Sequence, residues 1–227
     1  MSESFSNVIR NATQRREPFY GIAKKYIKED AVILDIGAGN GSFAEFIGRD
    51  DIFMVDGNLD TVVQNQTRYR NYLHCILPDI PFRVDQFDVI HCSHVIEHLS
   101  SDDLYTLLIN CNNRLKSGGY LIFSTPLMWE QFWDDLSHTR PYSPKIFEKY
   151  LCDTTISNPT RESISAKYTV VELQYRYNLR NIGPDVVIVR SRIINSLLQV
   201  ILRFLTRVGF RRVEKTGYTI VLKKGLN

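Results

Sequence analysis

The chain has 227 residues, of which 44% are hydrophobic and 23% are charged, and this composition indicates a globular domain with a large core. The net charge of +3 is too small to require a nucleic-acid partner, and no stretch approaches the roughly 20 apolar residues of a membrane-spanning helix. Four scattered cysteines and the lack of a basic-then-apolar leader predict a cytoplasmic protein with reduced thiols and no zinc knuckle.

The first expected element is a helix over residues 18–28, which follows a polar arm that reaches Asn11. Its apolar residues recur at helical spacing, so one face would pack against a sheet or cover a ligand. Further along, periodicity predicts helices over 59–69, 101–115 and 145–151 and strands over 72–77, 86–91 and 120–124.

A glycine-rich turn follows the first predicted strand. The apolar run 32–34 ends at Asp35, and three alternating glycines then lead into a helix that begins at Ser42; they are Gly37, Gly39 and Gly41. Glycines allow unusual backbone angles and let a ligand touch the main chain. A dinucleotide site would need glycine or alanine at position 42, and Asp35 would repel a pyrophosphate but attract an ammonium group.

A second acidic residue lies at the end of the next strand. Residues 52–55 read as a buried strand that ends at Asp56 and Gly57. A carboxylate at this place can accept hydrogen bonds from both hydroxyls of a ribose. An Asp-Gly pair alone is more typical of a turn, but its distance from the glycine turn favours a ribose site.

Together, Asp35, the three glycines and Asp56 resemble the first motifs of the class I S-adenosylmethionine-dependent methyltransferases. The resemblance implies an α/β fold, a doubly wound Rossmann-like seven-stranded sheet with an antiparallel last strand. It also implies that S-adenosylmethionine is the cofactor. The residues expected to bind the cofactor are Asp35, Gly37, Ala38, Gly39, Gly41, Asp56, Gly57, Asp79, Ile80, Ser93 and His94. A glycine turn without a ligand is the alternative.

For the contact with the adenine, two alternatives stay open. The segment 78–82 resembles the acidic segment that meets the adenine in this family, and either Asp79 or the backbone near Ile80 would make the contact. Ser93 and His94 follow the strand 86–91, at the carboxyl end where open parallel sheets bind ligands.

The run from His94 to His98 also fits a metalloprotease pattern, with Glu97 between the two histidines. That pattern requires both histidines on one helix face. Since a strand runs directly into His94, we expect no metal site. For His98, a role facing the substrate and a hydrogen bond to the backbone stay open.

The loop after the strand 120–124 is expected to lie over the reactive end of the cofactor. Its candidate acceptor-binding residues are Trp129, Trp133, Arg140 and Tyr142, and the candidate general bases are His138 and then His98. The segment 138–144 resembles one found in methyltransferases of glycan assembly. It favours O-methylation of a sugar or another small hydroxylated acceptor. The alternatives are a lipid-linked, protein or nucleic-acid acceptor, a non-catalytic cofactor-binding subunit, or a purely anchoring role for His138 and Arg140.

Near its end the chain departs from a simple hairpin. Between strands over 168–175 and 217–225, residues 191–208 predict a basic amphipathic helix. Such a helix would lie on an anionic membrane at the inner face, form a homodimer or other interface through 190–212, or pack over the substrate cleft. We expect one domain over 1–227, with a core at about 18–178 and 216–227 and an inserted element at about 184–212.

Overall fold

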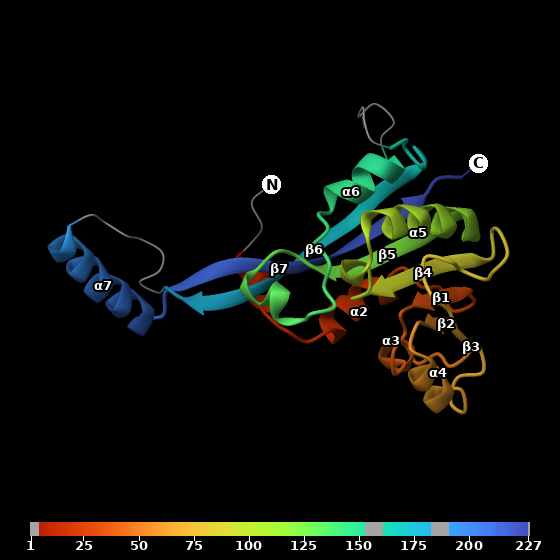
Figure 1. The fold of residues 1–227 in the computed structure, drawn as a ribbon, viewed down its shortest axis with the longest axis horizontal. Helices are drawn as coiled ribbons and strands as arrows, with labels where there is room; N and C mark the ends of the chain where they lie inside the picture. The colour runs from red at the N-terminus through yellow and green to blue at the C-terminus, as the bar shows by residue number, and fades with distance from the viewer. Residues whose placement is uncertain (1–4, 153–160, 183–190, 227) are drawn as a thin grey trace. The chain divides into compact units, whose positions relative to one another are not determined.

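The computed structural model describes residues 5–152, 161–182 and 191–226 (Figure 1). The chain divides into two compact units. We name residues 15–175 and 217–227 the core unit, and residues 1–14 and 176–216 the helical unit. Residues 183–190, which hold Arg190 and the start of the expected insertion, lie outside the described residues. The expectation of one domain over 1–227 stays a prediction.

The described residues form a seven-stranded sheet in the order β3-β2-β1-β4-β5-β7-β6. Strands β1 to β5 pair in parallel, and β7 is antiparallel to β5, with Ile122 opposite Val221. This arrangement confirms the expected doubly wound sheet with an antiparallel last strand. The bounds are β1 (Ile33–Ile36), β2 (Phe53–Asp56), β3 (Tyr72–His74), β4 (Phe87–Ser93), β5 (Leu115–Pro126), β6 (Tyr168–Asn181) and β7 (Arg211–Lys224).

The helices are α1 (Phe5–Arg10), α2 (Glu17–Lys24), α3 (Ser42–Ile47), α4 (Leu59–Asn65), α5 (Ser101–Arg114), α6 (Lys145–Phe147) and α7 (Arg192–Arg207). Two 3-10 helices, η1 (Ile96–His98) and η2 (Glu130–Asp134), and a π-helical turn, η3 (Glu148–Cys152), complete the described elements. Helix α5 begins where the Ser100 side chain accepts a hydrogen bond from the Asp103 amide at 3.1 Å, as an N-cap residue does.

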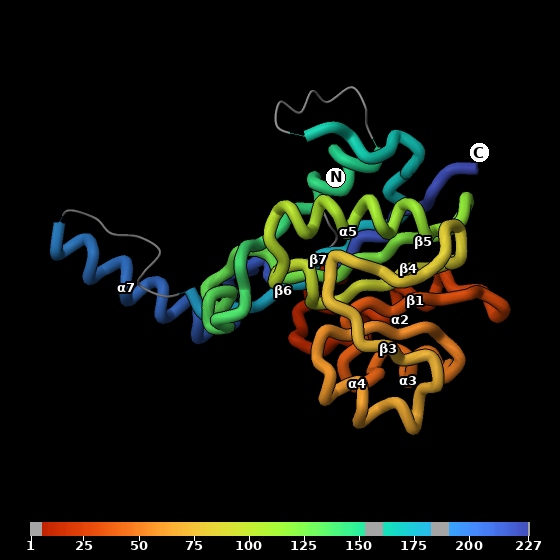
Figure 2. The backbone as a smooth tube through the Cα atoms, turned by 45° about the vertical axis from the view of Figure 1, so that its right-hand side comes forward, coloured from red at the N-terminus to blue at the C-terminus, as the bar shows by residue number. Residues whose placement is uncertain are grey.

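Both faces of the sheet in the core unit are covered. On β1, Ile33 packs with residues of α2, α3 and α4, whereas Leu34 packs with residues of α5 and α6. Successive side chains of a strand point to opposite faces, so these two apolar clusters are the two layers of a doubly wound fold. Figure 2 shows α5 on one side of the parallel strands and α3 and α4 on the other.

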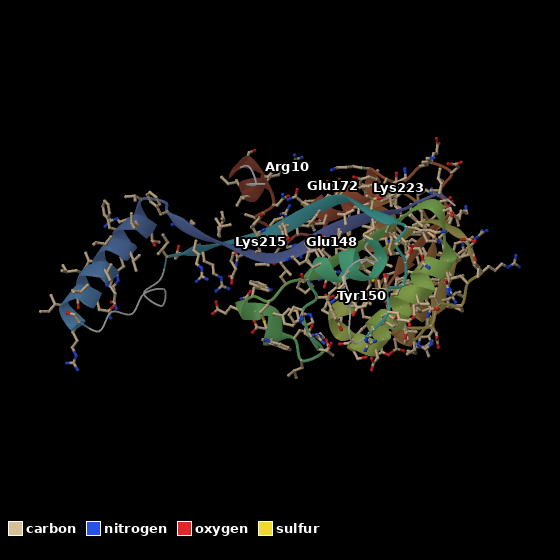
Figure 3. All side chains as sticks on the ribbon, turned by 90° about the horizontal axis from the view of Figure 1, so that it is seen from above. Arg10, Glu148, Tyr150, Glu172, Lys215 and Lys223 are labelled. Carbon is tan, nitrogen blue, oxygen red and sulfur yellow. The ribbon has the colours of Figure 1, made fainter. Side chains whose placement is uncertain are left out.

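Several bounds differ from the sequence prediction. The expected polar arm contains α1, and β6 and β7 extend beyond the expected 168–175 and 217–225. Helix α2 ends at Lys24 instead of residue 28. Just beyond it, the side chains of Lys25 and Tyr26 each donate a hydrogen bond to Glu172 on β6 at 2.8 Å, and Glu172 is labelled in Figure 3. These bonds tie the end of α2 to the strand.

Candidate active site

The glycine turn lies between the carboxyl end of β1 and the start of α3. Gly37, Gly39 and Gly41 all have positive φ angles, of 70°, 55° and 80°. A Cβ atom at Gly37 would lie 2.1 Å from Val95, and one at Gly41 would lie 2.4 Å from the Tyr69 ring. At Gly39 no atom lies within 4 Å of that position. The main chain at Gly39 therefore faces open space that a ligand can fill.

This difference predicts unequal effects of alanine at Gly41 and at Gly39. Both positions have left-handed backbone angles, so each substitution costs about 1–2 kcal/mol of unfolding free energy. At Gly41 the clash with Tyr69 adds about 1–3 kcal/mol. Urea unfolding of both variants measures the difference, and equal losses would contradict it.

Asp56 is held in place beside this turn. Its Oδ2 accepts a hydrogen bond from the Gly39 amide at 2.9 Å, and its Oδ1 accepts one from the Asn58 amide at 2.9 Å. The half-buried carboxylate lines a cavity of about 390 Å³, together with Gly37 and Gly57. The further lining residues are Val55, Cys75, Ile76, Leu77, His94, Val95, His98 and Leu99.

The cavity lining differs from the prediction for the adenine end. Asp79 and Ile80 are not among its lining residues, and Ile76 and Leu77 lie there instead. Ile80 is buried, and its carbonyl accepts a hydrogen bond from Arg114 Nε at 2.6 Å. Ile80 therefore lies in the core. The residues that line the cavity, Ile76 and Leu77, follow directly after the end of β3 at His74.

A second cavity, of about 440 Å³, shares Gly37 with the first and includes Asp35, Ala38, Gly39 and Ser93 in its lining. Asp35 is 2% exposed, and His91 Nδ1 lies 2.7 Å from its Oδ1. The His91 ring stacks on Phe43 with centroids 3.8 Å apart. Sequence reasoning missed His91 because it lies within an apolar strand. Only the register of the β1–β4 pair, which places His91 opposite Asp35, brings the two side chains together.

Hydrogen bonds join two loops that are about forty residues apart in the chain. The Glu97 carbonyl accepts a bond from the Thr139 amide at 2.8 Å, and the Leu99 carbonyl accepts one from Thr139 Oγ1 at 2.7 Å. The Tyr142 hydroxyl also donates to the Leu99 carbonyl, at 3.0 Å. The loop after β5 is thus fixed against η1, at the edge of the cavity of about 390 Å³ that His98 lines.

This contact brings the two candidate bases together. The rings of His98 and His138 lie 4.9 Å apart. The Nδ1 of His98 is 3.2 Å from the Ser137 carbonyl, and that of His138 is 2.6 Å from the Phe132 carbonyl. Since a carbonyl only accepts, each Nδ1 carries the hydrogen, and the Nε2 of a neutral ring then keeps a lone pair that can accept a proton.

Glu97 is fully buried, and one of its carboxylate oxygens lies within 4.8 Å of a ring nitrogen of both His98 and His138. Its Oε2 accepts a hydrogen bond from Thr125 Oγ1 at 3.0 Å, and its Oε1 lies 3.3 Å from His94 Nδ1. Burial opposes ionisation of Glu97, but the hydrogen bond and charge of His94 outweigh it, so the pKa of Glu97 is lowered. The residue is therefore a carboxylate at neutral pH.

The histidine pattern of a metalloprotease is not arranged as that class requires. His94 has a positive φ of 56° and precedes the short 3-10 helix η1, so His94 and His98 do not share one α-helical face. A different set, Glu97, His98 and His138, has ligand atoms within 4.8 Å of one another. The expected absence of a metal stays a prediction.

The expected acceptor-binding residues separate into two groups. Trp133 is 52% exposed and Trp129 is half-buried. Tyr142 is buried with its hydroxyl bound to Leu99, and Arg140 donates to Ser101 Oγ and covers the Tyr142 ring. Tyr142 and Arg140 therefore anchor the loop to the start of α5, and a role for them in acceptor binding stays a prediction.

The sheet order, the open main chain at Gly39 and the carboxylates at the ends of β1 and β2 define the class of S-adenosylmethionine-dependent methyltransferases. A family model described as a methyltransferase domain matches residues 8–154, and the chain belongs to this family. The protein is thus a methyltransferase that uses S-adenosylmethionine. The residues present fit this cofactor, because the ribose-binding acid Asp56 and the open main chain at Gly39 line two cavities that share Gly37, and the Gly39 amide donates a hydrogen bond to Asp56.

Known proteins give further likenesses. The human N-terminal Xaa-Pro-Lys N-methyltransferase 1 is 28% identical in an alignment of 135 residues, and the match covers 55% of this chain and 60% of that protein. An S-adenosylmethionine-dependent methyltransferase from Archaeoglobus fulgidus superposes with a TM-score of 0.55 at 18% identity, over 97% of this chain and 100% of that one. The YcgJ protein from Bacillus subtilis superposes with a TM-score of 0.58 at 16% identity, over 92% and 98%. The two structures support the fold.

Proposed function

We propose that this protein methylates a hydroxyl oxygen of a sugar or another small hydroxylated acceptor. The observation that carries the proposal is the His98–His138 pair beside the cavity that His98 lines, because each Nδ1 faces a backbone carbonyl and the Nε2 of a neutral ring can then accept a proton. The Nε2 of His138 also lies 4.0 Å from Asp135 Oδ2. When bound, S-adenosylmethionine supplies a methyl group on a cationic sulfur. Asp56 would hold its ribose, and the main chain at Gly39 would lie against it.

The chain's own part in the reaction is to orient the acceptor and remove its proton. A neutral hydroxyl is a poor nucleophile, and a positioned base contributes about 100- to 10,000-fold to the rate. His138 is the first candidate for this base because its Nδ1 is held by the shorter hydrogen bond, at 2.6 Å. The exposed Trp133 offers a flat apolar surface on which a sugar ring can stack.

A second candidate acceptor is the α-amino group of a protein N-terminus. The name of the human relative states that activity, and the match covers 60% of the length of that relative. A protonated amine must also lose a proton before it can attack, so the same histidine pair would serve either acceptor. The two proposals therefore differ in the acceptor and agree on the base.

Turnover with a defined acceptor panel distinguishes them. The protein is incubated with S-adenosylmethionine and either a set of free and lipid-linked sugars or peptides that begin with Xaa-Pro-Lys. Release of S-adenosylhomocysteine is then measured. We expect turnover with a sugar and a methyl group on oxygen by mass spectrometry. Turnover with the peptides alone would replace the hydroxyl proposal by the amine one, and turnover with neither set would contradict both.

A further inference from the structure

Helix α7 of the helical unit carries an exposed apolar face. Six of its residues and its C-cap residue, Val208, recur at spacings of three, four and seven, which places them on one side of the helix. Each is between 50% and 75% exposed, and we name them the apolar stripe: Ile193, Ile194, Leu197, Val200, Ile201, Phe204 and Val208. Of the large side chains of α7, the structure buries none fully. So much exposed apolar surface in one place indicates a binding surface.

The apolar stripe continues into a groove of the same unit. A cavity of about 420 Å³ is lined by residues of α1, β6 and β7 and by the turn after α7, and Val208 belongs to both surfaces. Ile9, Phe210 and Val213 in its lining are 52%, 58% and 46% exposed. The stripe and the groove are therefore one apolar surface, and all of it belongs to the helical unit.

Basic residues accompany this surface. Arg192, Arg203 and Arg207 lie on the polar side of α7, which contains no acidic residue, and Arg203 and Arg207 border the stripe. Arg211, Arg212 and Lys215 follow on β7, and Lys215 is labelled in Figure 3. The helical unit has ten basic residues and three acidic ones in its sequence, hence a net charge of +7. An occupant of this surface must therefore be both apolar and anionic.

We propose that the helical unit docks on the surface of an anionic phospholipid bilayer. The apolar stripe would enter the boundary between headgroups and acyl chains, and the arginines would lie at the level of the lipid phosphates. The helix would lie in the plane of the surface, since α7 has 16 residues and, in the described part of the chain, no helix is both long and apolar enough to cross a bilayer. The proposal uses residues of the helical unit alone and does not depend on the acceptor.

Vesicle sedimentation of the full chain tests the proposal. Wild type should pellet with vesicles of phosphatidylcholine and phosphatidylglycerol, and pelleting should weaken with salt. It should stay in solution with phosphatidylcholine alone. The double variant Arg203→Gln, Arg207→Gln should partition about 30-fold more weakly, because each basic residue near an anionic surface contributes a factor of about five. Glutamine is a good helix former, so α7 should persist in this variant.

A matched control removes the same charge elsewhere. The double variant Arg70→Gln, Arg83→Gln changes two exposed arginines of the core unit and should pellet like wild type. The variant Ile201→Ser, Phe204→Ser removes part of the apolar stripe and should lose more than about 100-fold in partitioning.

The rival occupants give different results. Assembly of wild type into dimers without any vesicle binding would assign the stripe to a second copy of the chain. A monomer that fails to bind anionic vesicles would show that the stripe does not dock on a lipid surface. Either result, or equal weakening by the Arg70 and Arg83 control, would overturn the membrane proposal.

Discussion

Replacing Asp56 with alanine is expected to weaken the binding of S-adenosylmethionine by about 100- to 10,000-fold, while the protein stays folded. The variant would lose the two charge-assisted hydrogen bonds that the carboxylate accepts from the ribose, each worth about 1.5–3 kcal/mol. A loss of 1.4 kcal/mol corresponds to about a tenfold loss of affinity. The substitution also frees the Gly39 amide, which Asp56 Oδ2 binds at 2.9 Å. The glycine turn would then be less well ordered before the cofactor arrives.

Titration calorimetry on two further variants separates these effects. Asp56→Asn keeps one oxygen that can accept the Gly39 hydrogen bond, so we expect a loss between that of alanine and wild type. Asp60→Ala removes the same charge from the exposed first turn of α4 and should leave the affinity unchanged. Equal affinities of Asp56→Ala and wild type would remove Asp56 from the cofactor site.

The second large effect is expected from His138→Asn. The amide nitrogen of asparagine takes the place of Nδ1, so the hydrogen bond to the Phe132 carbonyl, which measures 2.6 Å with histidine, can be kept. The Nε2 atom is lost. If His138 is the general base, kcat should fall by about 100- to 10,000-fold, with little change in cofactor affinity. Single-turnover rates with the best acceptor of the panel measure this.

Two comparisons make the histidine result specific. His98→Asn should have a smaller effect on kcat, because its Nδ1 is bound less closely, at 3.2 Å. A chelator should leave the wild-type rate unchanged, whereas a chelator-sensitive rate would indicate that Glu97, His98 and His138 hold a cation. Full activity of His138→Asn would show that this residue only anchors the loop.

The sheet and the cofactor turn could be predicted because their signals are local. An apolar run buried on both faces marks β1, and alternating glycines with an acid mark the turn that follows it. Period-2 and period-3.6 patterns likewise gave the position of most strands and helices. Nothing local in residues 211–224 encodes the direction of the last strand. Its antiparallel direction therefore follows only from the family resemblance.

The pairing of side chains that are far apart in the chain could not be predicted. His91 and Asp35 are 56 residues apart and meet only through the register of β1 and β4. His98 meets His138 because backbone hydrogen bonds of Thr139 fix one loop to the other. An aromatic ring in a loop can be exposed or buried, so the sequence could not predict that Tyr142 is buried with its hydroxyl bound to the Leu99 carbonyl.

Titration of the wild-type protein with S-adenosylmethionine and, separately, with NAD⁺ tests the cofactor assignment most directly. Gly39 and Asp56 should give saturable binding of S-adenosylmethionine at one site per chain, and NAD⁺ should neither bind there nor compete. Absence of S-adenosylmethionine binding, or its displacement by the dinucleotide, would contradict the assignment.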